Sequence, residues 1–104
     1  MFEMTFSRPL AAFRLAEEQA CMGYLTARKS MVRLASRVAS IAQLVREHPT
    51  RADYRAALEH VKGLHVDAVD RTRLAWLRWQ NAQVRSDAFW AASNEAGASV
   101  AVAA

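Results

Sequence analysis

Histidine and cysteine are the side chains that most often bind metals or act as nucleophiles. This sequence contains three histidines and one cysteine. His60 and His65 are five residues apart, so on a helix they point about 140° away from each other and cannot share one metal ion. No histidine belongs to the Glu-x-x-His pair that di-iron helical bundles use. The sequence therefore predicts no metal site.

Catalytic groups are equally hard to assemble from these residues. Cys21 would act as a nucleophile only beside a base and with a lowered pKa, and its place next to Ala20 favours a small hydrophobic side chain packed between helices. Glu17 and Glu18 diverge by about 100° on a helix and do not form an acid–base pair. No phosphate-binding glycine loop, nucleophile elbow or His-Glu-x-x-His motif occurs. We expect a protein that is not an enzyme and needs no cofactor.

The basic residues suggest a different kind of chemistry, which is anion binding. The net charge is +4 and the isoelectric point is near 10.0, and a basic surface attracts polyanions. Lys29, Arg33 and Arg37 follow one another at four-residue intervals and form a candidate anion-binding stripe. A solvated, partly ion-paired face explains this stripe equally well, and no helix-turn-helix recognition unit is present. Nucleic-acid binding is therefore kept as an alternative that the sequence disfavours.

Two long helices must position all of these side chains. Strong helix formers fill the chain, which has only three glycines and two prolines. Ser7 is a suitable N-cap for a helix over residues 7–48, and Pro49 ends it. Thr50 is the expected N-cap of a second helix over residues 51–96, with Asp53 near the capping-box position. A connection this short predicts an antiparallel hairpin in one all-α domain, residues 1–104, with a frayed tail at 97–104. A break near Gly63, which would give a three-helix bundle, is the alternative.

A heptad pattern runs along both predicted helices. In the first helix, ten of the eleven seam positions are apolar: Leu10, Phe13, Glu17, Ala20, Tyr24, Ala27, Met31, Leu34, Val38, Ile41 and Val45. The second helix has a broader stripe: Tyr54, Leu58, Val61, Leu64, Ala68, Ala75, Trp79, Ala82 and Phe89, with Val69, Trp76 and Trp90 beside it. These patterns predict that the two helices pack along a continuous seam.

Charge and size support the antiparallel direction. With the turn centred on Pro49, residue n lies beside residue 98 minus n, within one helical turn. Basic residues of the first helix (Arg28, Lys29, Arg33, Arg37, Arg46) then face acidic ones of the second (Asp53, Glu59, Asp67, Asp70). The tryptophans would likewise face the small residues Ala11, Ala12, Ala16, Ala20 and Gly23.

The apolar stripe of the second helix is wider than one partner helix can cover. We expect the excess to form an interaction surface made of Trp76, Trp79, Trp90, Phe89, Leu74, Leu77 and Val84. Its simplest use is homo-oligomerisation, as a dimeric four-helix bundle. A helical partner protein, or an apolar polymer or lipid surface, would fit the same residues. No run is long and apolar enough to cross a membrane, and the lone cysteine indicates a cytoplasmic protein.

The two heptad segments LAEEQACMGYLTARKSMVRLASRVASIAQ and ADYRAALEHVKGLHVDAVDRTRLAWLRWQNAQ form a small, basic, alanine-rich pair of coiled helices. In architecture and composition this pair resembles the phasins, proteins that coat polyhydroxyalkanoate granules. The resemblance covers residues 7–96 and implies a non-catalytic surfactant role. We predict a helical interaction or assembly protein, and the resemblance implies that it coats granules. A heteromeric subunit of a secretion or phage assembly is a further alternative.

Overall fold

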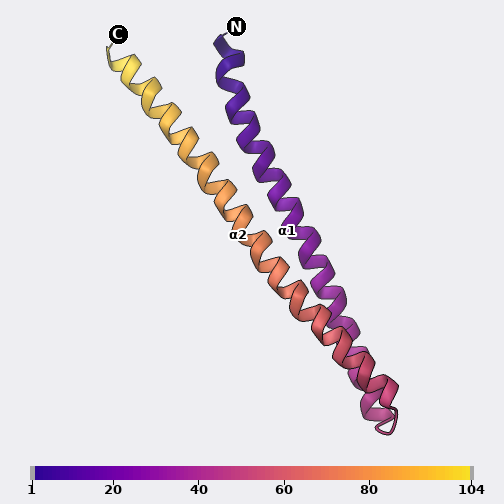
Figure 1. The fold of residues 1–104 in the computed structure, drawn as a ribbon. Helices are drawn as coiled ribbons and strands as arrows, with labels where there is room; N and C mark the ends of the chain where they lie inside the picture. Colours follow the sequence, from indigo (N-terminus) through magenta and orange to yellow (C-terminus); the bar gives the residue numbers. More distant parts are fainter. Residues whose placement is uncertain (1, 104) are drawn as a thin grey trace. The chain divides into compact units, whose positions relative to one another are not determined.

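The computed structural model describes the backbone of residues 2–103 and the side chains of residues 9–95. It contains two helices, α1 (Phe2–Glu47) and α2 (Ala52–Ala103), joined by residues 48–51 (Figure 1). The described part of the chain has no strand. The predicted all-α helical hairpin is therefore confirmed.

The first helix begins earlier than the sequence predicted. It starts at Phe2 rather than near Ser7, and Pro9 lies inside it. Proline has no N–H, so the helix loses the hydrogen bond to the carbonyl of residue 5 at this point. Neither glycine nor a second proline occurs before Pro9, and a single missing bond does not end the helix.

The turn is only four residues long and is closed by backbone hydrogen bonds. The N–H of His48 donates to the carbonyl of Leu44 at 2.8 Å, and the N–H of Arg51 donates to the carbonyl of His48 at 3.1 Å. The carbonyl of Arg51 accepts the first bond of α2, from the N–H of Arg55 at 3.4 Å. Arg51 is therefore the N-cap residue, and the prediction of Thr50 is wrong by one position.

Side chains reinforce the same turn. The Arg51 guanidinium donates to both carboxylate oxygens of Asp53, at 2.9 and 2.7 Å, and lies 4.2 Å from the centre of the Tyr54 ring. The hydrogen bond from Arg51 lowers the pKa of Asp53. The His48 ring meets Tyr54 edge-on at 5.8 Å, and Arg55 donates to the carbonyl of Pro49 at 2.6 Å. These contacts hold the two helix ends together.

The second helix is continuous through Gly63, so the three-helix alternative is wrong. A Cβ atom added to Gly63 would meet nothing within 4 Å, which shows that no close packing requires glycine there. The helix extends to Ala103, beyond the predicted end at residue 96. The predicted fraying of residues 97–104 falls outside the side chains that the structure describes.

The chain divides into two compact units. Unit 1 comprises Met1–Met22 and Trp76–Ala104, and unit 2 comprises Gly23–Ala75. Along α1 the partly buried positions are the eleven predicted seam residues together with Cys21 and Ala42. The heptad prediction for this helix is therefore confirmed.

The seam of α2 is more regular and more polar than predicted. A series of its protected positions repeats every three or four residues: Tyr54, Leu58, Val61, His65, Ala68, Thr72, Ala75, Trp79, Ala82, Ser86, Phe89 and Ser93. Beside this series, Val69, Gln80 and Gln83 are also partly buried. His65 takes the place that the sequence assigned to Leu64, which is 38% exposed. Thr72 and Ser86 are buried, and the Thr72 hydroxyl donates to the carbonyl of Ala68 at 2.7 Å. That bond satisfies the hydroxyl inside its own helix, so a polar residue is accepted in the seam.

The register within unit 1 is set by two aromatic rings. Phe13 lies against Phe89 with ring centroids 5.0 Å apart. The predicted register would have placed residue 85 opposite Phe13, so the observed register differs by one helical turn, which is the margin that the prediction allowed.

Candidate interaction surfaces

One flank of the seam in unit 2 carries exposed aliphatic residues, which alternate with the charged residues Arg28, Arg46, Arg55, Glu59, Lys62 and Arg73. Leu25, Val32 and Val66 are 48%, 57% and 57% exposed, and each directly follows a seam residue. Successive residues turn by about 100°, and because α1 and α2 are antiparallel, residues that follow seam positions lie on the same flank in both helices. We define the apolar face as the aliphatic residues of this flank: Leu25, Val32, Ala35, Ala39 and Ala42 of α1, with Val66 and Val69 of α2.

The other flank of unit 2 carries the residues that directly precede seam positions. It holds exposed charged residues, among them Arg33, Arg37, Asp67 and Arg71, and also the exposed leucines Leu44, Leu64 and Leu74. Both flanks therefore mix charged and apolar side chains. The first flank differs in that it carries three alanines, Ala35, Ala39 and Ala42, beside Leu25, Val32 and Val66.

The basic stripe of Lys29, Arg33 and Arg37 is exposed. Among the side chains of residues 9–95, the ion pairs are Arg51–Asp53 at 2.7 Å and Lys62–Glu59 at 3.6 Å, and each joins residues two or three positions apart in the sequence. The predicted pairing between basic residues of α1 and acidic residues of α2 therefore does not occur as direct contacts. Long side chains at the edge of a narrow seam stay hydrated because an exposed ion pair stabilises little.

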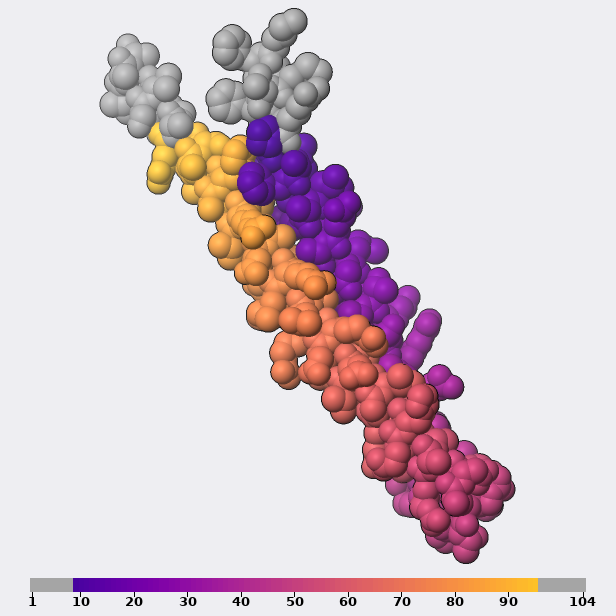
Figure 2. Space-filling view, in the orientation of Figure 1, coloured from indigo at the N-terminus to yellow at the C-terminus, as the bar shows by residue number. Residues whose placement is uncertain are grey.

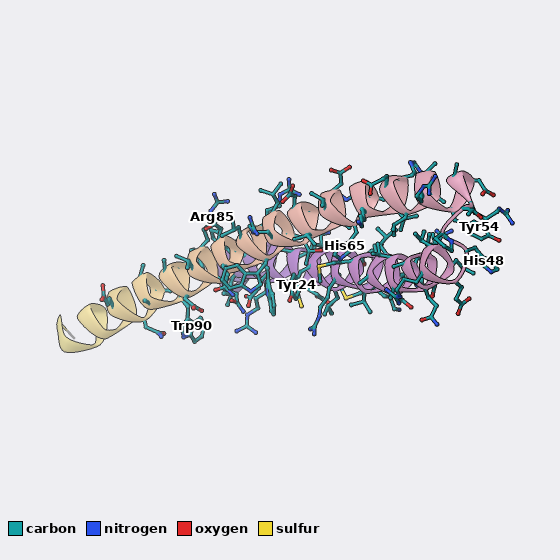
Figure 3. All side chains as sticks on the ribbon, turned by 90° about the horizontal axis from the view of Figure 1, so that it is seen from below. Tyr24, His48, Tyr54, His65, Arg85 and Trp90 are labelled. Atoms are coloured by element: carbon teal, nitrogen blue, oxygen red, sulfur yellow. The ribbon has the colours of Figure 1, made fainter. Side chains whose placement is uncertain are left out.

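The residues predicted as an interaction surface lie in different places. Trp79 and Phe89 are seam residues and are partly buried, whereas Trp76 and Trp90 follow seam residues and are 44% and 49% exposed. Three aliphatic residues are also exposed: Leu74, Leu77 and Val84. Figure 3 shows Trp90 and Arg85 projecting from opposite sides of α2. The set predicted from sequence is therefore not one continuous surface.

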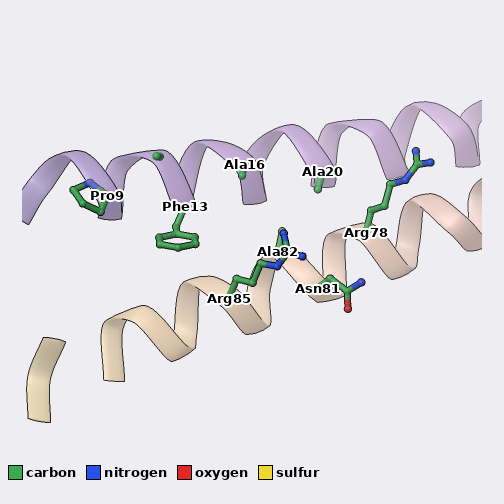
Figure 4. Close-up of a pocket in the computed structure, with 9 residues that line it drawn as sticks. Pro9, Phe13, Ala16, Ala20, Arg78, Asn81, Ala82 and Arg85 are labelled. Carbon is green, nitrogen blue, oxygen red and sulfur yellow. The ribbon is translucent and has the colours of Figure 1, made fainter. Parts of the chain in front are cut away.

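Unit 1 contains a groove between its two helices. Its volume is about 500 Å³, and α1 supplies Pro9, Ala12, Phe13, Ala16 and Ala20 while α2 supplies Arg78, Asn81, Ala82 and Arg85 (Figure 4). The predicted filling of the small residues by tryptophan is therefore wrong at this site. Trp76 and Trp90 follow seam residues, whereas Arg78 and Arg85 precede them, so the arginines and not the indoles lie on the side of the groove.

A second hollow, of about 240 Å³, opens on the other flank of unit 1. Leu10, Arg14, Glu17, Ser86, Asp87 and Trp90 line it. It contains two carboxylates and one arginine, whereas the described residues that line the groove include two arginines and no acid. The two flanks of unit 1 therefore differ in the sign of their net charge.

The residues considered first for chemistry are scattered. His48 lies in the turn, His60 is exposed, His65 is in the seam of α2, and Cys21 is partly buried. In the described residues, no group of three or more His, Cys, Asp or Glu side chains is placed to hold a metal ion. Neither helix, over the part described, has a segment long and apolar enough to cross a membrane.

Comparisons of the chain with protein-family models, with curated proteins and with solved structures find no match. The function proposed below therefore rests on the surfaces just described.

Proposed function

We propose that the chain is a helical assembly module that pairs with a second copy of itself through the apolar face of unit 2. One observation carries the proposal: among the described side chains, only Val61 and Ala68 are buried apolar residues, whereas the apolar face lies open on one flank. The face of α2 that is turned to the viewer in Figure 2 is likewise not covered by another segment. A hairpin with so small a core gains most of its stability by burying this face.

The accessible surface area of the chain is larger than that of a typical folded monomer of the same mass. The chain exposes 8118 Å², whereas a folded monomer of 11.6 kDa exposes about 5,800 Å². A standard interface buries about 800 Å² per partner, which is well below the excess. One standard interface with a second copy would therefore remove part of this excess.

The position of the apolar face suits a four-helix bundle. In such a bundle each helix has two neighbours in directions roughly at right angles, one of which is supplied here by the hairpin itself. Residues that follow seam positions point toward the second direction. Ala35, Ala39 and Ala42 are small and would let the helices of the second copy approach closely.

Sedimentation equilibrium tests the assembly. We expect the native chain to be dimeric or larger at micromolar concentration and Val66→Glu to be monomeric, because the new charge would be buried in the interface. Leu74→Glu is a matched control: Leu74 is 53% exposed, close to the 57% of Val66, and it lies on the opposite flank. A native chain that stays monomeric, or equal loss of assembly in both variants, would contradict the proposal.

The resemblance to phasins suggests that the same face could instead adsorb to an apolar polymer. Adsorption to polyhydroxyalkanoate particles distinguishes the two uses. A granule coat would bind the particles through Val66 and release them in Val66→Glu, whereas an assembly module would remain in solution as an oligomer. If the chain is instead a subunit of a secretion or phage assembly, the apolar face would bind a different helical protein. The product would then be a heteromer and not a homodimer.

A nucleic-acid-binding function is favoured by one observation, which is that Lys29, Arg33 and Arg37 are exposed and have no ion-pair partner among the described side chains. Retention on duplex DNA tests it. A phosphate-binding stripe would hold DNA at low salt, with a steep loss of affinity as salt rises and a smaller slope in Arg33→Gln. Absence of retention at physiological salt would exclude this function.

A further inference from the structure

We infer that the groove of unit 1 is a binding site for a long-chain carboxylate, such as a fatty acid. The inference does not depend on the apolar face, because every residue that lines the groove belongs to unit 1. It rests on the composition of the groove, its size and the sign of the charges at its edge.

The floor of the groove is formed mainly by short, apolar side chains. Ala12, Ala16 and Ala20 lie one helical turn apart on α1, with Phe13 beside them and Ala82 opposite. Small side chains at this spacing leave a channel that runs along the helix, about 16 Å from Pro9 to Ala20. An alkyl chain laid in this channel would remove its methylene groups from water, and each buried methylene is favourable by transfer from water.

The edge of the groove is cationic. Arg78 and Arg85 are seven residues apart on α2, with Asn81 between them, and none of the described residues that line the groove is acidic. A guanidinium binds a carboxylate through two parallel N–H donors, which fixes the orientation of the acid as well as its position. Asn81 adds a neutral amide that can donate to the same head group. The opposite hollow, which holds Glu17 and Asp87, would repel such a ligand.

The size of the groove favours a small ligand over a macromolecule. A volume of about 500 Å³ lies within the range of small-molecule sites, which is about 300 to 1,000 Å³. Phosphate backbones would meet two arginines but also a floor of alanine and phenylalanine, which offers them no hydrogen bond.

Calorimetric titration with dodecanoate, below its micelle concentration, tests the inference on the full chain. We expect saturable binding that falls at least about tenfold in the double variant Arg78→Gln/Arg85→Gln, because charge-assisted bonds to the carboxylate are lost. Arg71→Gln, outside the groove, should bind as the native chain does. Dodecanol, which has the same chain and no charge, should bind at least about tenfold more weakly than dodecanoate.

Blocking the groove provides the second arm. Ala16→Phe should abolish binding, with Ala12→Phe as an independent variant should the first lose helicity, while Ala91→Phe, on an exposed part of unit 1 outside the groove, should not change it. Equal affinity for dodecanol, or binding that survives both blocking variants, would overturn the inference. Val66→Glu should bind dodecanoate normally, so failure of the assembly proposal and failure of this site are told apart.

Discussion

The two units are built from the same two helices but pack differently. In unit 2 the seam joins large aliphatic residues, such as Met31, Leu34 and Ile41, to Val61 and Ala68, which are 6% and 1% exposed. In unit 1 the seam combines the rings of Phe13, Trp79 and Phe89 with Ala20 and Ala82, and the only buried side chain among those described is Ser86. The heptad repeat continues through both, so spacing alone does not close a seam. Beside the seam of unit 1, the short side chains of Ala12 and Ala16 leave a groove open between the helices.

The largest effect should come from a charge placed in the closed seam. Val61→Asp would bury an unpaired carboxylate at a position that is 6% exposed, and we expect loss of several kcal/mol and of most of the helical structure. Circular dichroism during urea unfolding measures this. Val84→Asp, at a position that is 65% exposed, should change the unfolding midpoint little. Equal destabilisation by both changes would show that the seam of unit 2 is not closed.

Truncation of one leucine in each unit should show the difference in packing directly. Leu34→Ala, in the seam of unit 2, should destabilise the chain by about 2 to 3 kcal/mol. Leu10→Ala, in the seam of unit 1, should cost about 1 kcal/mol or less, because the neighbouring hollow already leaves part of that side chain without contacts. Chemical denaturation at one fixed protein concentration gives both values. A larger loss for Leu10→Ala would reverse the comparison.

A smaller, stabilising effect is expected at Gly63. A Cβ atom there meets nothing within 4 Å and the backbone is helical, so Gly63→Ala should stabilise the chain by about 0.5 to 1 kcal/mol. Thermal unfolding measures the change. Gly23→Ala, where a Cβ is equally unobstructed, should behave in the same way. A destabilised Gly63→Ala would mean that the helix is interrupted at this position.

The smallest effect should be a pH dependence at the turn. Arg51 holds the pKa of Asp53 below its ordinary value, so the pair contributes stability above the unfolded pKa of about 4 and loses it as the pH falls through the lowered folded pKa. Asp53→Asn should remove this part of the acid dependence and leave the stability at pH 7 slightly reduced. Unfolding curves between pH 7 and pH 2 test the sign. Stability that increased on acidification would contradict it.

The sequence predicted the helices and the seam of α1 because hydrophobic spacing and Pro49 act locally. It misplaced the seam of α2 at Leu64, because hydrophobicity favoured the leucine although the heptad spacing points to His65. It missed Thr72 and Ser86 for the same reason, although their place in the repeat was a usable signal. The groove was not predicted, because the sequence reasoning did not separate the two flanks of α2: Arg78 and Arg85 precede seam positions and lie on the side of the alanines, whereas Trp76 and Trp90 follow seam positions.

The central claim is that the apolar face of unit 2 meets the same face of a second copy, and a distance between copies tests it most directly. A chain with Cys21→Ser and Val66→Cys carries one spin label on the apolar face. The same background with Leu74→Cys carries the label on the opposite flank of unit 2. We expect the dipolar coupling between copies to be stronger, and the distance between labels to be shorter, at position 66 than at position 74. The absence of coupling at position 66 in an assembled sample, or a shorter distance at position 74, would contradict the claim.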